Sequence, residues 1–378
     1  MKCKMAAILI LIQIFSFTAC WDSTETERLA VVTLLGIGLD SENKIEVTIQ
    51  ETGGKNKSNF NVFNESGDTI SEAVEKMALN QHHRIYFGHT KVVILSEELA
   101  STKGIVPVID FFQREGEIRP TAKLLVSKNE QLNRIFSTDF GFSSDTGTIL
   151  EETLKNRKNS PNALANNIND FIELLASPGC EAFTAGIGLK IKDVNIASKS
   201  SANKNEIFDL SSIAIFKDTK MTDWLTGDEA RGLWWVKGNP VGGLVSISFG
   251  NKKLSSRIVR GRSNIKPSIN GDKIYIDINT NVICNIEESQ FITDFLNEPL
   301  LREIEEAQNE KIKEEISAAV KKSLSLKQDI FGFGKYIYAS YPVYFVKNTS
   351  YYKDININIK VSSTVRNIRI NYKPLIRQ

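Results

Sequence analysis

Apolar positions in the first half of the chain follow two different periods, which predicts a mixed α/β region over residues 29–194. Runs typical of buried or alternating strands occur at 29–40, 44–50, 91–95, 121–127 and 183–191. Stripes spaced three or four residues apart lie between them, as in Ile70, Val74 and Met77 after the capping-box pair Thr69 and Glu72. The helical pattern from 145 to 176 leaves open whether a second subdomain begins at about residue 145.

The second half follows a different pattern, with strands surrounding one long helix. Strands are predicted at 212–216, 243–249, 273–286, 355–361 and 365–370. Apolar residues at helical spacing predict a helix over about 299–326, with Glu and Lys on its other faces. This order indicates a C-terminal α+β domain over 208–378, in which a long helix packs on an antiparallel sheet. Residues 195–207 have little apolar periodicity and are predicted to be a linker.

The first 28 residues differ from both halves. Lys2 and Lys4 precede an apolar run that is too short to cross a bilayer comfortably, and small residues lead to Cys20. This pattern is similar to a bacterial lipoprotein signal. We therefore expect a signal peptide over 1–19, diacylglycerol on the thiol of Cys20, and a lipidated tether over 20–28. An ordinary cleaved signal with an incidental cysteine is the alternative.

Composition places the remaining chain among globular proteins. After a cut before Cys20, about 360 residues remain, which is enough for two or three domains. The full sequence contains 47 basic residues, and without Lys2 and Lys4 of the predicted signal their number equals that of the 45 acidic residues. This neutral balance argues against a nucleic-acid partner. Cys180 and Cys284 are too few for a disulfide scaffold, and whether they pair is left open.

Candidate chemistry is sparse. The three histidines, His82, His83 and His89, lie close together, but no cysteine or carboxylate set accompanies them, so we expect no metal site and a hydrogen-bonding structural role for His89. Hydrolase motifs such as Gly-x-Ser-x-Gly do not occur, and we expect no catalytic residue and no cofactor. Trp234 and Trp235 are adjacent, which leaves two possibilities: one is an exposed anchor for a partner, or both are packed.

Several short motifs together resemble one family. Cys20-Trp21-Asp22 and Gly36-Ile37-Gly38-Leu39-Asp40 are followed by Gly88-His89-Thr90-Lys91 and by Ile109-Asp110-Phe111-Phe112-Gln113-Arg114. Gly232-Leu233-Trp234-Trp235 and Asp329-Ile330-Phe331-Gly332-Phe333-Gly334 come later. In order and spacing they resemble the C-subunit lipoproteins of spore germinant receptors, the Ger(x)C family, over nearly all of the mature chain.

The resemblance implies a non-enzymatic subunit that is lipid-anchored through Cys20 on the outer face of the inner spore membrane. It implies the A and B subunits of the receptor as partners and successive α/β domains as the fold. Whether this subunit binds a small molecule directly stays open. Two alternatives remain: a solute-binding lipoprotein that feeds a transporter, which requires two similar lobes, and a cell-wall enzyme, which requires a catalytic constellation.

Overall fold

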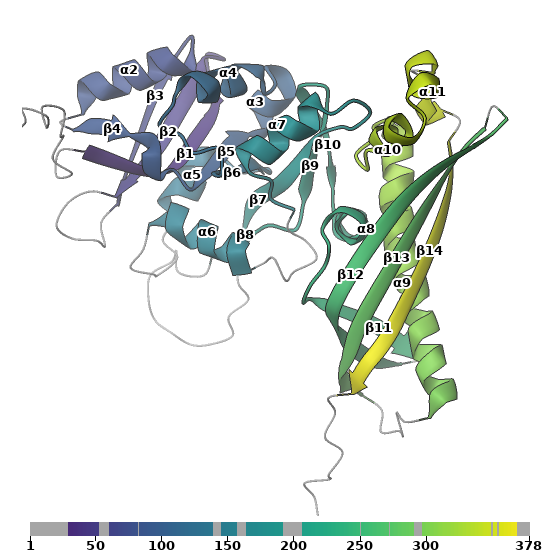
Figure 1. The fold of residues 1–378 in the computed structure, drawn as a ribbon. Helices are drawn as coiled ribbons and strands as arrows, with labels where there is room; N and C mark the ends of the chain where they lie inside the picture. Colours follow the sequence, from purple (N-terminus) through teal and green to yellow (C-terminus); the bar gives the residue numbers. More distant parts are fainter. Residues whose placement is uncertain are drawn as a thin grey trace, which may run out of the picture.

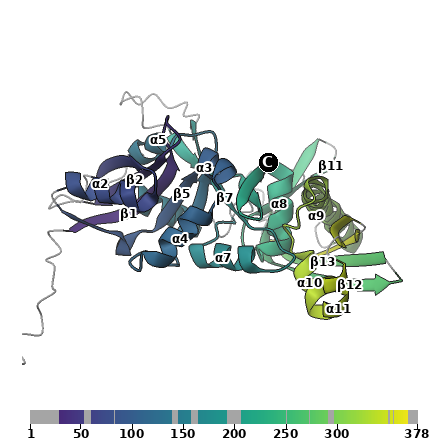
Figure 2. The same cartoon turned by 90° about the horizontal axis from the view of Figure 1, so that it is seen from above.

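The computed structural model describes residues 29–52, 60–81, 83–138, 145–156, 164–191, 206–249, 251–271, 273–290, 297–348, 351–353 and 355–368. The predicted signal peptide, the tether and Cys20 lie outside these residues, as does most of the predicted linker. The described part forms two units that lie side by side (Figures 1 and 2).

The first unit is built on a ten-stranded sheet in the order β10-β9-β7-β6-β5-β1-β2-β3, with β4 beside β1 and β8 beside β7. Its strands are β1 (Leu29–Leu39), β2 (Ile45–Thr52), β3 (Phe60–Gly67), β4 (Arg84–Tyr86), β5 (Val92–Ser96), β6 (Lys123–Ser127), β7 (Phe183–Ile191), β8 (Glu206–Asp209), β9 (Ile213–Lys217) and β10 (Lys220–Leu225). The central strands β1, β5, β6 and β7 are parallel, and antiparallel strands flank them on both sides.

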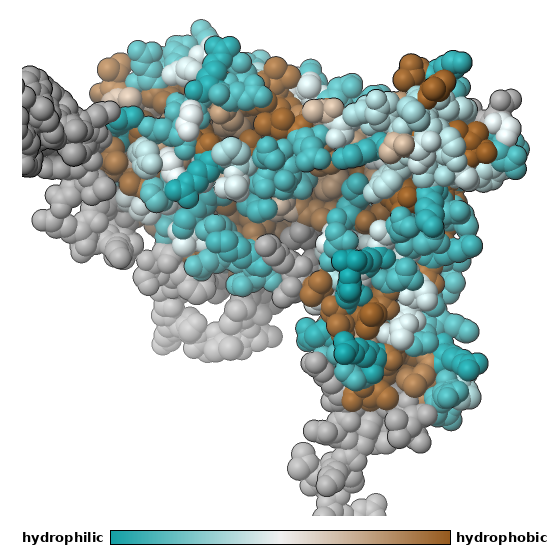
Figure 3. All heavy atoms as spheres, viewed as in Figure 1, coloured by the Kyte–Doolittle hydropathy of each residue, from teal (hydrophilic) through white to brown (hydrophobic). Residues whose placement is uncertain are grey.

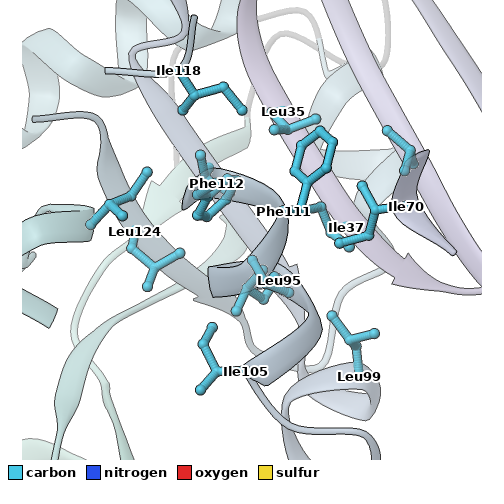
Figure 4. Close-up of a cluster of buried hydrophobic side chains, with 14 of the residues drawn as sticks. Leu35, Ile37, Ile70, Leu95, Leu99, Ile105, Phe111, Phe112, Ile118 and Leu124 are labelled. Atoms are coloured by element: carbon cyan, nitrogen blue, oxygen red, sulfur yellow. The ribbon is translucent and has the colours of Figure 1, made fainter. Parts of the chain in front are cut away.

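Helices cover both faces of this sheet, because its central strands are apolar on both sides. They are α2 (Ile70–Asn80), α3 (Glu97–Thr102), α4 (Val106–Arg114), α5 (Leu132–Ser137), α6 (Thr146–Asn156) and α7 (Ile168–Ala176), with the short η2 (Phe87–His89) after β4. Side chains of α2, α3, α4 and α7 share one core with the sheet, part of which Figure 4 shows. Those of α5 and α6 pack against the opposite face. The predicted start of α2 is confirmed, since Thr69 Oγ1 accepts a hydrogen bond from the Glu72 N–H at 3.1 Å.

The second unit is a four-stranded sheet with a long helix across one face (Figure 1). Its elements are α8 (Gly227–Lys237), β11 (Leu244–Phe249), β12 (Lys252–Asn270), β13 (Lys273–Ser289), α9 (Glu298–Leu326), α10 (Phe333–Ser340), α11 (Pro342–Lys347), η4 (Tyr351–Lys353) and β14 (Ile355–Ile368). The predicted mixed α/β class and the long helix on a sheet are confirmed.

Two details of the second sheet differ from expectation. Strand β14 pairs with β13 in parallel, so the sheet is mixed and not wholly antiparallel. The connection through α9 returns the chain to the same end of the sheet, and such a crossover places the next strand parallel. In addition, the two short strands expected at 355–361 and 365–370 form the single strand β14.

The strands after the predicted linker join the first sheet. We expected residues from 208 onwards to belong to the C-terminal domain, but β9 pairs with β7, and β10 pairs with β9. Strand β9 is apolar on both faces: Ala214 and Phe216 lie in the core of the first unit, whereas Ile213 and Ile215 lie in that of the second. The position of the domain boundary stays a proposal, and this pairing favours one after β10.

Candidate functional site: the junction between the two units

The motif at 329–334 lies between α9 and α10, where the second unit meets the first. The residue after α9 is Lys327, which has the left-handed conformation (φ 55°, ψ 43°) that commonly ends a helix. Gly332 also has a positive φ, 68°, and directly precedes α10. The motif is therefore a helix-ending turn. It brings one carboxylate, Asp329, into the interior of the protein.

Asp329 is the centre of a buried hydrogen-bond network. Its side chain accepts bonds from the N–H groups of Phe333 (2.9 Å) and Gly334 (2.8 Å), which are the first donors of α10. The hydroxyl of Tyr351 donates a third bond to it at 2.8 Å. The backbone carbonyl of Asp329 accepts a bond from the N–H of Glu181, which is part of the first unit (2.8 Å). One residue thus caps α10, holds η4 and joins the two units.

Burial also changes the protonation of this carboxyl. Desolvation raises the pKa of Asp329 to about 6, against the lowering influence of the Gly334 and Phe333 N–H groups, the Tyr351 hydroxyl and the charge of Lys237. Lys237, the last residue of α8, donates to the carbonyl of Phe331 at 3.1 Å. Burial lowers the pKa of Lys237. Because the carboxylate faces donors of the chain itself, its geometry is that of a structural group.

Two glycines allow the units to come into backbone contact at this point. A Cβ on Gly179, in the loop before β7, would lie 2.6 Å from Gly334 Cα, a separation that real Cβ atoms essentially never show. Gly179 has φ +68°, which favours glycine on its own account. The N–H of Lys335 donates to the carbonyl of Gly179 at 3.2 Å. The close approach therefore requires glycine on both sides.

A small pocket of about 230 Å³ opens at the junction. It is lined by Leu175, Ser177, Gly179, Cys180, Glu181, Asp218, Asp329 and Tyr351. Burial raises the pKa of the Cys180 thiol to about 11, which keeps it protonated and weakly nucleophilic at neutral pH. Cys180 and Cys284 are both free thiols. Cys284 is fully buried in β13.

The tryptophan motif forms the contact between α8 and α9. Both Trp234 and Trp235 are buried, which excludes the alternative that one of them is an exposed anchor. The indole N–H of Trp235 donates to Glu315 at 2.7 Å, and the other oxygen of Glu315 accepts from Arg231 at 2.9 Å. A Cβ on Gly232 would lie 2.0 Å from the Glu315 carbonyl oxygen, so the two helices touch at this glycine.

The aromatic pair of the motif at 109–114 is packed, whereas the described histidines are exposed. Phe111 and Phe112 of α4 are buried in the core of the first unit. His82 lies outside the described residues, and His83 is exposed. His89 is exposed too, and its ring contacts Tyr86 edge-on at 5.9 Å. Among the described residues it makes no side-chain hydrogen bond of the kind that we expected.

Two properties of the described residues bear on metal binding and on membrane crossing. Within those ranges, no group of three or more His, Cys, Asp or Glu side chains is placed to hold a metal ion. None of the helices in the described part of the chain combines the length and the apolar character needed to cross a membrane.

Comparison with known proteins gives concordant matches over nearly the whole chain. The family described as "Spore germination protein N-terminal domain" matches residues 22–189, and "Spore germination B3/GerAC like, C-terminal" matches residues 211–369. Spore germination protein KC of Bacillus subtilis (strain 168) is 24% identical over 401 residues, covering 100% of this chain and 98% of that protein. Spore germination protein B3 of the same organism is 23% identical over 321 residues, covering 79% and 80%.

A solved structure supports the same fold. The crystal structure of the GerBC protein matches with a TM-score of 0.58 at 17% identity, covering 88% of this chain and 97% of that one. At this identity the likeness bears on the fold alone.

Proposed function

This chain belongs to the Ger(x)C family of spore germinant receptor C subunits, and we propose that it is a non-catalytic scaffold of such a receptor, anchored by lipid on Cys20. The lipid would hold it on the outer face of the inner spore membrane. Its partners would be the A and B subunits of the receptor. Two or three acyl chains on one cysteine suffice for stable anchoring, whereas a single chain binds only marginally.

One observation carries the scaffold interpretation: two of the family motifs in the described region, at 232–235 and 329–334, are used for internal contacts. Asp329 and Gly334 join the two units, and Gly232 and Trp235 join α8 to α9. Side chains that are engaged in this way define a fixed shape. A protein that works by presenting surfaces to partners needs such a shape.

The architecture counts against the solute-binding alternative. A binding protein of that class closes two similar lobes around its ligand. Here the first unit has a ten-stranded sheet with helices on both faces, and the second has four strands and one long helix. The two units therefore lack the similarity that this alternative requires.

The anchor is tested by Cys20→Ala in spores. We expect a high-salt wash, which weakens peripheral electrostatic contacts but not acyl anchors, to release the variant from the membrane fraction, and spore germination to be impaired. Cys180→Ala is the matched control, because it also removes one thiol, and it should stay with the membrane. Mass spectrometry of the native N-terminus should show an acylated cysteine, and co-purification should recover the A and B subunits. A Cys20→Ala chain that still sediments with membranes after the high-salt wash, as the wild type does, would refute the anchor.

A further inference from the structure

The short helix α11 presents apolar side chains to solvent. None of its six residues, all of which the structure describes, is buried. Val343 and Val346 are 67% and 69% exposed, and Tyr338 and Tyr341 of the preceding segment are 45% and 37% exposed. Four of the eleven large apolar side chains that are exposed in the described residues thus fall within nine positions. Figure 3 shows brown atoms gathered at the tip of the molecule that α11 forms.

This exposure belongs to a segment whose other side is firmly packed. The ring of Phe345 lies 5.6 Å from that of Tyr338 and 5.3 Å from that of Tyr351. Tyr351 in turn donates to the buried Asp329. The hairpin of α10 and α11 is therefore fixed to the junction on one side, and its apolar tip projects from the body (Figure 1). We define the tip patch as Tyr338, Tyr341, Val343, Val346 and Lys347.

The charges in the segment around the tip patch are positive. Residues 330–353 contain three lysines and no Asp or Glu. Lys335 pairs with Glu173 of the first unit at 3.5 Å, and Lys347 lies within the tip patch. Exposed Val and Tyr beside Lys are typical of segments that lie in the lipid interface, where Tyr rings occupy the headgroup level and Lys reaches the phosphates. The buried cores of protein–protein interfaces are instead depleted in Lys. A convex apolar tip with positive charge therefore complements an anionic lipid surface.

We propose that the tip patch is a second membrane contact, which inserts Val343 and Val346 among the headgroups of an anionic bilayer. The proposal rests on the proposed function, because lipid on Cys20 would keep the tip near the membrane at high effective concentration. The tether over 20–28 spans up to about 30 Å when extended. In both cartoon views the dark purple start of β1 lies at the end of the molecule away from α10 and α11 (Figures 1 and 2). Contacts at both ends would lay the body along the membrane and fix its orientation toward its partners.

The test uses the mature chain, residues 20–378 with Cys20→Ala, so that no acyl group contributes. Binding is measured by co-sedimentation with phosphatidylglycerol vesicles and with phosphatidylcholine vesicles. We expect binding that prefers the anionic vesicles, and a loss of about tenfold or more in the variant Val343→Asp/Val346→Asp. Leu79→Asp is the matched control, because Leu79 is 80% exposed on α2 and distant in sequence from the patch, and it should bind like the parent.

A second variant keeps the test independent of folding. Lys347→Glu reverses one exposed charge without placing an acid on an apolar position, and it should weaken binding to the anionic vesicles by about fivefold or more. Failure of the parent chain to bind vesicles would overturn the proposal, as would equal binding by all variants. If the double variant no longer co-purifies with the receptor subunits but binds vesicles as the parent does, the patch contacts a protein partner and not lipid. An unmodified native Cys20 would refute the proposed anchor and leave the vesicle result standing.

Discussion

Alanine at Gly179 is the most direct test of the contact between the two units. An added Cβ would lie 2.6 Å from Gly334 Cα and 2.7 Å from Gly334 C, so it would overlap backbone atoms and not the end of a flexible side chain. Neither atom can move without displacing the start of α10. That displacement would also stretch the bond from the Lys335 N–H to the Gly179 carbonyl.

The magnitude has two parts. A left-handed conformation costs a non-glycine residue about 1–2 kcal/mol. Forcing extra volume into a packed contact typically adds about 1–3 kcal/mol. We therefore expect Gly179→Ala to lower the free energy of unfolding by about 2–5 kcal/mol, a large fraction of the ~5–15 kcal/mol of a typical domain.

Urea denaturation of the mature chain, followed by circular dichroism, measures this loss. Gly271→Ala is the matched control, because Gly271 has a similar φ of +60° and nothing lies within 4 Å of its added Cβ. The control should lose only about 1–2 kcal/mol, the conformational part. If the two variants lose the same amount, the backbone contact at the junction is not what requires glycine at position 179, and the reasoning fails.

Two further predictions address the buried polar contacts. Burial raises the pKa of Asp329 from 3.8 to about 6, so the folded chain binds this proton more tightly than the unfolded chain. The stabilisation is complete below about pH 4 and is lost as the pH rises through about 6. Between pH 7 and pH 5 we expect the wild type to gain about 1 kcal/mol over Asp329→Asn in urea denaturation, and a pH-independent difference would contradict this assignment. Trp235→Phe should be less stable than Trp234→Phe by about 1–2 kcal/mol, because only the former loses the bond to Glu315. Equal losses would show that this bond contributes nothing beyond packing.

Local patterns predicted the elements that depend on neighbouring residues. The capping-box pair Thr69 and Glu72 predicted the start of α2, and the Glu72 N–H donates to the Thr69 hydroxyl at 3.1 Å. The apolar stripe over about 299–326 predicted α9, which spans Glu298–Leu326. In both cases residues within one or two turns of each other supply the signal, so the sequence alone suffices.

Strands with interrupted alternation were missed. The longest, β12, has a register shift between Ile258 and Arg260. Its buried positions change phase there, from Leu254, Ser256 and Ile258 to Gly261 and Ile265. Pro267, which lacks an N–H for the ladder, further weakens the strand pattern. The shorter β3 and β10 were also missed.

The junction could not be predicted, because its partners are distant in sequence. Asp329 is a polar residue after a helix, and local reasoning places such a residue in a solvated turn. Its buried state depends on Tyr351, on Glu181 from the first unit and on the first N–H groups of α10. The motif itself was noticed in the sequence, but only the structure shows that its glycine faces Gly179.

The two faces of strand β9 belong to the cores of different units, and this arrangement restrains how the units move. Phe216 on one face of β9 packs in the core of the first unit, and Ile215 on the other face packs in the core of the second. Two units that share a strand in this way cannot rotate about a linker without exposing apolar surface from both cores, at a cost of roughly 25 cal/mol per Å². The Asp329 network and the Gly179–Gly334 contact restrain the same junction from a second point. A body held at two points keeps a fixed angle between its units, which is the property that a receptor subunit acting through its surfaces requires.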